Sequence, residues 1–378
     1  MRDVDWHKCR FLESSENLKP LVQKRFGREP STSVAREIVA CLQQGRLFYE
    51  AAARSPLEIR PLQLFYGMVG FSKALIVARH GRSLSTLPQT HGLKDISAHN
   101  SRIAELRIKI GNAGTFQDFN DVVAELSHLR YTDSYSKPCT VLLPSAKSSQ
   151  LCDAELCLRE ILGRIPGLES LYKMTFAEEA QTAYIGLATA YQDDKSFLIC
   201  VDDFELFTDR ESLKRIVTRW RTKFPFLKQW RLASARHAYN RSDLRFQNTS
   251  NVGMDEFSET HLESRNGGFE ASAQDGDQNA PFPLKSGLDP LAERGTYAIS
   301  PVGGHHICEF SFHYLGLFLL SSLVRYRPQT WMHAISSSVL EQAPADDQAL
   351  SLIDQFLDLN NSVIPAMAVT VLNPHEDR

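Results

Sequence analysis

Two arginines, a tyrosine and a tryptophan stand close together near the C-terminal end of the sequence, and together they could hold an anion. The run reads Arg325-Tyr326-Arg327-Pro328-Gln329-Thr330-Trp331. A guanidinium fork matches the oxygens of phosphate, and an aromatic face can stack on a base. We therefore predict that Arg325, Tyr326 and Trp331 bind a nucleotide or RNA. In the alternative interpretation, the arginines bind the free carbonyl groups at the end of a helix.

His333 follows Arg327 in the same stretch, and the two side chain types together could cleave RNA without a metal ion. A histidine can act as general base or acid, while an arginine stabilises the charged phosphorane-like transition state. Composition alone produces several Arg/His pairs of this spacing, and Pro328 interrupts a regular helix between the two residues. Arg327 and His333 are nevertheless the candidate catalytic residues if the protein is an enzyme.

A second histidine group comprises His305, His306 and His313, with Cys308 between them. Such side chains ligate transition metals. Adjacent residues point apart on a helix or a strand, however, and no carboxylate pair joins the group at a recognisable spacing. The sequence also lacks the P-loop, dinucleotide-binding, zinc-protease and nucleophile-elbow motifs. We therefore expect neither a metal site nor a cofactor.

A basic segment at 205–245 is the other candidate binding surface. It has eleven Lys or Arg against four Asp or Glu, with aromatic residues interleaved. Basic and aromatic side chains together can bind a phosphate backbone and stack bases, although a solvated helix face above core aromatics gives the same pattern. The candidate binding residues here are Arg219, Arg221, Lys223, Lys228, Trp230 and Arg231. The acidic stretch that follows could fold back and screen this surface.

Length and composition indicate a globular protein of more than one part. The chain has 378 residues, 43% of them hydrophobic, and a net charge of −3. No overall field therefore attracts a nucleic acid or a membrane. The seven scattered cysteines and the polar N-terminus, which lacks the apolar core of a signal peptide, predict a reduced, cytoplasmic location.

Hydrophobic periodicity predicts a mainly α protein, a helical bundle formed by N- and C-terminal helices with a small α+β insertion in the middle. The expected parts are an N-terminal helical part at 1–168, the insertion at 169–246, a flexible acidic loop at 247–295 and a C-terminal helical part at 296–378. Helices are expected at 34–49, 62–77, 122–129, 154–162, 208–223, 312–325, 331–340 and 350–359. Strands are expected at 182–190, 196–201 and 230–235, the first two as a hairpin.

Two long stretches resemble the YaaC-like family of bacterial proteins. The first reads Arg60-Pro61-Leu62-Gln63-Leu64-Phe65-Tyr66-Gly67 and continues to His91-Gly92-Leu93 and Gly114-Thr115-Phe116. The second reads Leu320-Ser321-Ser322-Leu323-Val324-Arg325-Tyr326-Arg327-Pro328 and ends at Trp331. This resemblance implies a mostly helical cytosolic bacterial protein. The helical ends also resemble HEPN-type domains, whose metal-free ribonucleases use an arginine followed closely by a histidine.

Two functions follow as hypotheses. The first is a nonenzymatic binding or regulatory module for RNA, a nucleotide or a protein partner. The second is a HEPN-like, metal-independent endoribonuclease acting in stress response or phage defence. A membrane is not an expected partner, and the sequence leaves the oligomeric state open.

Overall fold

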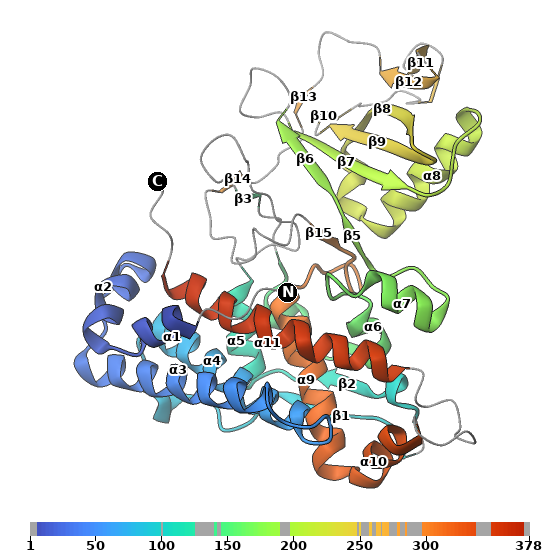
Figure 1. Cartoon of the computed structure of the whole chain (residues 1–378). Helices are drawn as coiled ribbons and strands as arrows, with labels where there is room; N and C mark the ends of the chain where they lie inside the picture. Colours follow the sequence, from blue (N-terminus) through green and yellow to red (C-terminus); the bar gives the residue numbers. More distant parts are fainter. Residues whose placement is uncertain are drawn as a thin grey trace.

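Helices predominate in the structure, a computed structural model that confirms the mainly α class (Figure 1). It describes residues 6–99, 101–124, 140–141, 145–189, 197–247, 249–250, 257–258, 262–265, 267–271, 278–279, 284–285, 297–337 and 349–373.

The N-terminal helices begin and end where the sequence offers caps. They are α1 (Trp6–Leu12), α2 (Ser15–Phe26), α3 (Thr32–Ala52) and α4 (Arg60–His80). The Ser31 hydroxyl accepts a hydrogen bond from the Val34 N–H at 3.3 Å, which satisfies a free donor at the start of α3. Gly81 ends α4 with a φ of 61°, a left-handed conformation that glycine adopts without strain.

Helix α4 lies at the centre of the helical body and packs against helices from both ends of the chain. Its neighbours are α3, α9 (Glu309–Tyr326) and α11 (Leu350–Leu372), drawn beside one another in Figure 1. Glycine permits the close contact with α3, because a Cβ added at Gly67 would lie 2.4 Å from the Tyr49 ring. The predicted packing of N-terminal on C-terminal helices is therefore present around α4.

A buried polar network joins α3, α9 and α11. The Tyr49 hydroxyl donates to Asn360 Oδ1 at 2.7 Å, and the Asn360 amide lies 3.1 Å from His313 Nδ1. The His313 ring stacks on Phe356 and is fully buried. Buried polar groups need such partners, since an unpaired one loses its hydration without compensation.

The C-terminal part is helical, with small differences from the prediction. Pro328 opens α10 (Pro328–Ser337), as a proline at the first helical position can, so the predicted break falls at the right residue. Residues 338–340 lie outside the described ranges. The helix expected at 350–359 continues to Leu372 as α11, with Pro365 inside it.

The N-terminal part expected to be helical at 1–168 also contains strands. A three-stranded antiparallel sheet lies there, in the order β1 (Leu93–Asp95), β2 (Arg107–Ile110) and β4 (Glu155–Cys157). The predicted helix at 154–162 therefore starts as a strand, because Leu156 pairs with Ile108 and both are buried. Only α6 (Leu158–Leu162) is helical. The helix expected at 122–129 is α5 (Thr115–Val123), and 125–129 lie outside the described residues.

The α+β part has a six-stranded antiparallel sheet with one helix on it. Its order is β11 (Leu262–Arg265), β12 (Gly268–Ala271), β8 (Arg231–Ala238), β9 (Arg241–Gln247), β7 (Phe197–Asp203) and β6 (Gly186–Thr189). The predicted hairpin is confirmed as β6 and β7, and the strand at 230–235 as β8. Helix α8 (Arg210–Lys223) begins at the Asp209 carboxylate, which accepts from the Ser212 N–H at 2.8 Å.

The segment expected as a loop at 247–295 contributes two strands to this sheet. Strand β12 pairs with β8, and β11 pairs with β12. Leu262 is fully buried, and Phe269 packs on Phe207 with 5.8 Å between ring centroids, so apolar side chains hold this hairpin. Most of the remaining segment, and with it the proposed screen, lies outside the described residues. The division of the chain into four parts stays a prediction.

Shorter elements connect the two parts. Strand β5 (Thr182–Tyr184) pairs with β15 (Tyr297–Ile299), β3 (Thr140–Val141) with β14 (Leu284–Lys285), and β10 (Thr249–Ser250) with β13 (Gln278–Asn279). Helix α7 (Glu169–Phe176) precedes β5. The 3-10 helices are Leu84–Thr86, Ile103–Glu105, Ser148–Gln150 and Pro225–Gln229.

One helix in the described part of the chain, α4, is long and apolar enough to span a membrane. Its most apolar window has a mean hydropathy of 1.3, and 72% of that window is buried inside the protein. A central core helix has the same length and composition, and the packing of α4 against α3, α9 and α11 fits that interpretation.

Candidate anion-binding site

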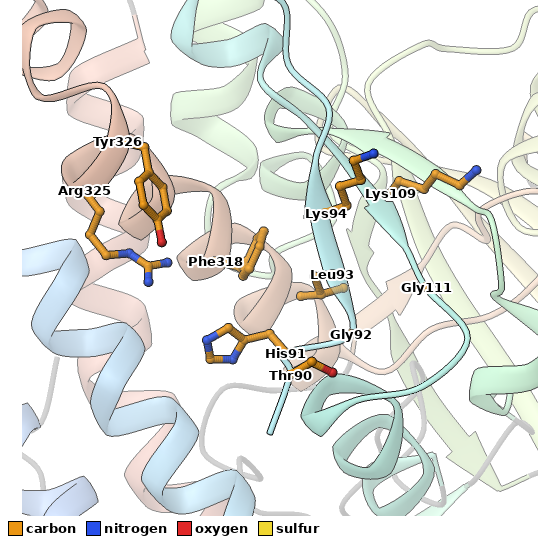
Figure 2. Close-up of a pocket in the computed structure, with 10 residues that line it drawn as sticks. All are labelled: Thr90, His91, Gly92, Leu93, Lys94, Lys109, Gly111, Phe318, Arg325 and Tyr326. Carbon is orange, nitrogen blue, oxygen red and sulfur yellow. The ribbon is translucent and has the colours of Figure 1, made fainter. Parts of the chain in front are cut away.

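A pocket of about 470 Å³ opens where the C-terminal end of α9 meets β1 and β2. Figure 2 shows Arg325 and Tyr326 on one side and Phe318 and His91 in the middle. Lys94 and Lys109 lie on the other side. We call it the α9 pocket, and it is lined by Thr90, His91, Gly92, Leu93, Lys94, Lys109, Gly111, Phe318, Arg325 and Tyr326. Every charged group in this lining is basic.

The start of α5 holds the turn that carries His91. The Thr115 N–H donates to the Thr90 carbonyl at 2.9 Å, and the Phe116 N–H donates to the His91 carbonyl at 3.1 Å. Gly92 has a φ of 73°, and a Cβ there would lie 1.8 Å from Gln117 Oε1. Only glycine fits this position, because both the backbone conformation and the space exclude a larger residue. The backbone turn at residues 90–92, which lines the pocket, is therefore fixed by the fold itself.

Lys94 and Lys109 face each other across the two strands. The antiparallel register places Lys94 directly opposite Lys109, so both side chains project from the same face of the sheet. The Asp153 carboxylate lies 2.8 Å from the Lys109 ammonium and partly neutralises it. Lys94 is exposed and has no ion-pair partner among the described residues. Like charges in this arrangement repel, and an anion placed between them would relieve the repulsion.

Arg325 presents its guanidinium group among aromatic rings. The group lies 4.9 Å from the Tyr326 ring centroid and 5.7 Å from that of Phe65. Its Nε donates to the Ser321 carbonyl at 3.2 Å, which satisfies one carbonyl near the end of α9. No carboxylate pairs with Arg325 in the part of the chain that the structure describes. Arg325 binds a helix carbonyl, as the structural interpretation expects, and it also lines a pocket, as an anion-binding residue would.

His91 is half-buried between Phe65 and Phe318, with ring centroids 5.1 and 6.0 Å away. Burial lowers its pKa, and the positive charges of Arg325 and Lys73 lower it further. The buried Nδ1 has no hydrogen-bond partner among the described residues. At neutral pH the imidazole is therefore uncharged, and a bound anion would favour its protonation.

The two residues of the predicted catalytic pair, Arg327 and His333, have different surroundings in this structure. The Arg327 guanidinium donates to the carbonyls of Ser97 and Ala98 at 3.0 and 3.1 Å and lies 3.6 Å from the Asp95 carboxylate. His333 is exposed on α10. Arg327 thus joins the end of α9 to the segment after β1, which is the structural interpretation of this arginine.

Trp331 is 1% exposed and donates its indole N–H to the Glu58 carbonyl at 2.9 Å. Its indole is buried in the protein, and the binding role given to Trp331 stays a prediction. Tyr326 is 72% exposed at the mouth of the α9 pocket and offers a face for a ligand to stack on. Of the predicted residues at this corner, Arg325 and Tyr326 lie together in the pocket.

Arginines of the predicted basic surface bind carboxylate and carbonyl groups of the protein itself. Arg219 pairs with the Asp203 carboxylate at 2.6 Å and with that of Glu205 at 2.5 Å. Arg221 donates to the carbonyls of Leu227 and Trp230 at 3.1 and 2.6 Å.

The remaining candidates of the basic segment are divided between surface and interior. Trp230 is 4% exposed in the apolar core beneath α8, so it cannot stack on a base. Lys228 is exposed, Arg231 is half-buried, and Lys223 lies in a second cavity described below.

Sequence reasoning gave no binding role to Lys94, Lys109 or His91. One signal was present, since His91-Gly92-Leu93 and Gly114-Thr115-Phe116 belong to the stretches that carry the family resemblance. The structure brings both stretches to the pocket that Arg325 lines. The sequence alone does not show that Lys94 lies opposite Lys109, because this pairing depends on the register of the two strands.

No group of three or more histidine, cysteine or acidic side chains suited to a metal gathers in the described ranges. His313, one of the candidate ligands, lies in the helical core and contacts Asn360 and Glu309. The α9 pocket is thus defined by lysine, arginine and aromatic side chains.

Fold and site together define a mainly α-helical protein with a preformed, cation-lined pocket. A family model described as YaaC-like Protein matches residues 10–372, so the chain belongs to the YaaC-like family. No curated protein and no solved structure matches the chain.

Proposed function

We propose that the protein is a cytoplasmic, nonenzymatic binding module that takes a nucleotide or a similar phosphorylated small molecule in the α9 pocket. The observation that carries this proposal is the lining itself, in which Lys94, Lys109 and Arg325 are the only charged groups. Cations gathered without an equal number of acids are unfavourable unless an anion binds among them.

The size and lining of the pocket favour a nucleotide over a bare phosphate ion as the ligand. A volume of about 470 Å³ lies within the range of small-molecule sites, which runs from about 300 to 1,000 Å³. Phosphate oxygens would bind the lysines, and a base would stack on Tyr326 beside the guanidinium of Arg325.

Binding is favoured over RNA cleavage because Arg327 is held by two carbonyl groups and a carboxylate. An arginine that stabilises a transition state must point its donors at the reacting phosphate instead. The endoribonuclease hypothesis therefore gains no support from the geometry around Arg327 and His333.

Isothermal titration of AMP, ADP and inorganic phosphate into the purified protein tests the proposal. AMP or ADP should bind more tightly than phosphate, and Arg325→Met and Lys94→Met should each weaken nucleotide binding about tenfold. Higher salt should also weaken it, since the attraction is electrostatic. Lys214→Met is the matched control, an exposed lysine outside the pocket, and should bind as the wild type does.

Two results would contradict the proposal. One is a lack of nucleotide binding at millimolar concentration, and the other is equal loss in Lys214→Met and Arg325→Met. A labelled RNA pool, incubated with the same variants in EDTA, separates the alternatives. Cleavage that disappears in folded Arg327→Ala and His333→Ala variants would establish the ribonuclease instead.

A further inference from the structure

A second and larger cavity, of about 1,240 Å³, lies between the helical body and the α+β part. Its walls come from α7, β5, β7, α8 and β15. It does not share a lining residue with the α9 pocket. We call it the α8 cavity. Its apolar surface includes the rings of Tyr184 and Tyr297, which meet edge to face at 5.6 Å.

Most charges around this cavity are paired with one another. Arg219 binds Asp203 and Glu205, and Arg215 also binds Glu205. Arg241 lies 3.8 Å from the Asp202 carboxylate, and Lys173 pairs with Glu179 at 2.5 Å. The Glu169 carboxylate accepts from the Thr182 hydroxyl at 2.7 Å. These groups therefore offer a ligand little net charge.

Lys223 is the exception in the lining. Its ammonium donates to the Thr182 carbonyl at 3.2 Å, and no carboxylate lies within ion-pair distance among the described residues. Burial lowers the pKa of Lys223 to about 8, although Glu179, Glu169 and Asp203 favour the charged form and Arg219 opposes it. These carboxylates act on the ammonium from beyond ion-pair distance, and a ligand carboxylate in the cavity would be its direct partner.

We propose that the α8 cavity is a second ligand site, which takes a small carboxylate with an apolar or aromatic body. The carboxylate binds Lys223, and the body lies against Tyr184, Tyr297 and the side of Trp220. A monoanion fits better than a phosphorylated ligand, because one cation is unpaired here and five acids line the walls. The proposal is independent of the nucleotide assigned to the α9 pocket.

Titration with benzoate, 1-naphthoate and octanoate, beside the uncharged 1-naphthalenemethanol, tests this site. At least one carboxylate should bind, and Lys223→Met should weaken it about tenfold while leaving the alcohol unchanged. Lys223→Met keeps the length of the side chain and removes a buried charge, so the variant should fold. Lys214→Met is the control, an exposed lysine on α8 outside the cavity lining, and should behave as the wild type.

The pH dependence gives a second measurement that needs no variant. The affinity of the wild-type protein for the carboxylate should fall as the pH rises above about 8, because the free amine loses its charge there. Saturating AMP should not displace the carboxylate. The proposal is overturned if no carboxylate binds at about 10 mM, if Lys223→Met binds as well as the wild type, or if AMP competes.

Discussion

Cationic side chains gather in two regions of this molecule, and the two regions differ in what surrounds them. Around α8 the sequence is strongly basic, yet Arg219 pairs with Asp203 and Glu205 and Arg221 binds backbone carbonyls. Around the end of α9 the basic run is short, yet Lys94 and Arg325 line a pocket, and neither has a carboxylate partner among the residues that the structure describes. Charge counted along a sequence therefore gives little indication of charge available to a ligand.

The largest effect should come from breaking the charge pairing beneath α8. Asp203→Ala removes a carboxylate that is 8% exposed and that accepts from Arg219 and from the Trp220 indole at 2.7 Å. We expect a loss of about 2 kcal/mol in the free energy of unfolding, chiefly because the buried indole N–H loses its acceptor. Urea denaturation measures it.

Arg325→Met is the matched control in the α9 pocket, because it removes a cation that has no carboxylate partner in the described part of the chain. It should change the free energy of unfolding by less than about 1 kcal/mol, the usual strength of a cation–π contact. If both variants lost the same stability, the distinction between paired and available cations would fail.

A smaller effect separates the two residues of the predicted catalytic pair. Arg327→Met should lower the free energy of unfolding by about 1 kcal/mol, since two carbonyl groups lose a donor. His333→Ala should stay within about 0.5 kcal/mol of the wild type, as exposed positions usually do. Thermal unfolding of the two variants compares them, and a larger loss in His333→Ala would contradict the structural role given to Arg327.

The smallest effect concerns pH. The pKa of His91 is lowered in the folded protein, so the unfolded chain binds a proton more readily near its ordinary pKa of about 6.5. The stability contributed by neutral His91 is complete above that pKa and is lost as the pH falls from it through the lower pKa of the folded protein.

Added phosphate should reduce this acid sensitivity, because protonated His91 attracts the anion. Melting temperatures recorded between about pH 8 and pH 5, with and without phosphate, measure it. His91→Phe should flatten the profile. A profile identical to that of the wild type would show that His91 does not titrate in this range.

The parts of the fold that depend on local sequence were predictable. Ser31 and Asp209 cap helices, Gly81 ends one, and the apolar run of α4 indicates a central helix. Strands of three or four residues, such as β1 and β2, are too short to show alternation, so the small sheet was missed. Its register places Lys94 against Lys109, which no local pattern reveals.

The candidate site was also predictable only where its residues adjoin in the sequence. Arg325 and Tyr326 were found because guanidinium and aromatic groups adjoin in the sequence. Trp331 and Trp230 were assigned to binding by residue type, whereas both lie in the core. Whether an aromatic residue faces solvent depends on contacts with distant segments, and these include the Glu58 carbonyl that receives the Trp331 indole.

The central position of α4 has a consequence for synthesis on the ribosome. Helix α4 ends at His80, whereas α9, which covers it, begins at Glu309. At roughly 5–20 residues per second, about 10–45 s pass before that partner emerges. During this interval an apolar helix long enough to span a bilayer has no native cover on that side. We therefore expect the nascent chain to depend on a chaperone that binds α4 until the C-terminal helices arrive.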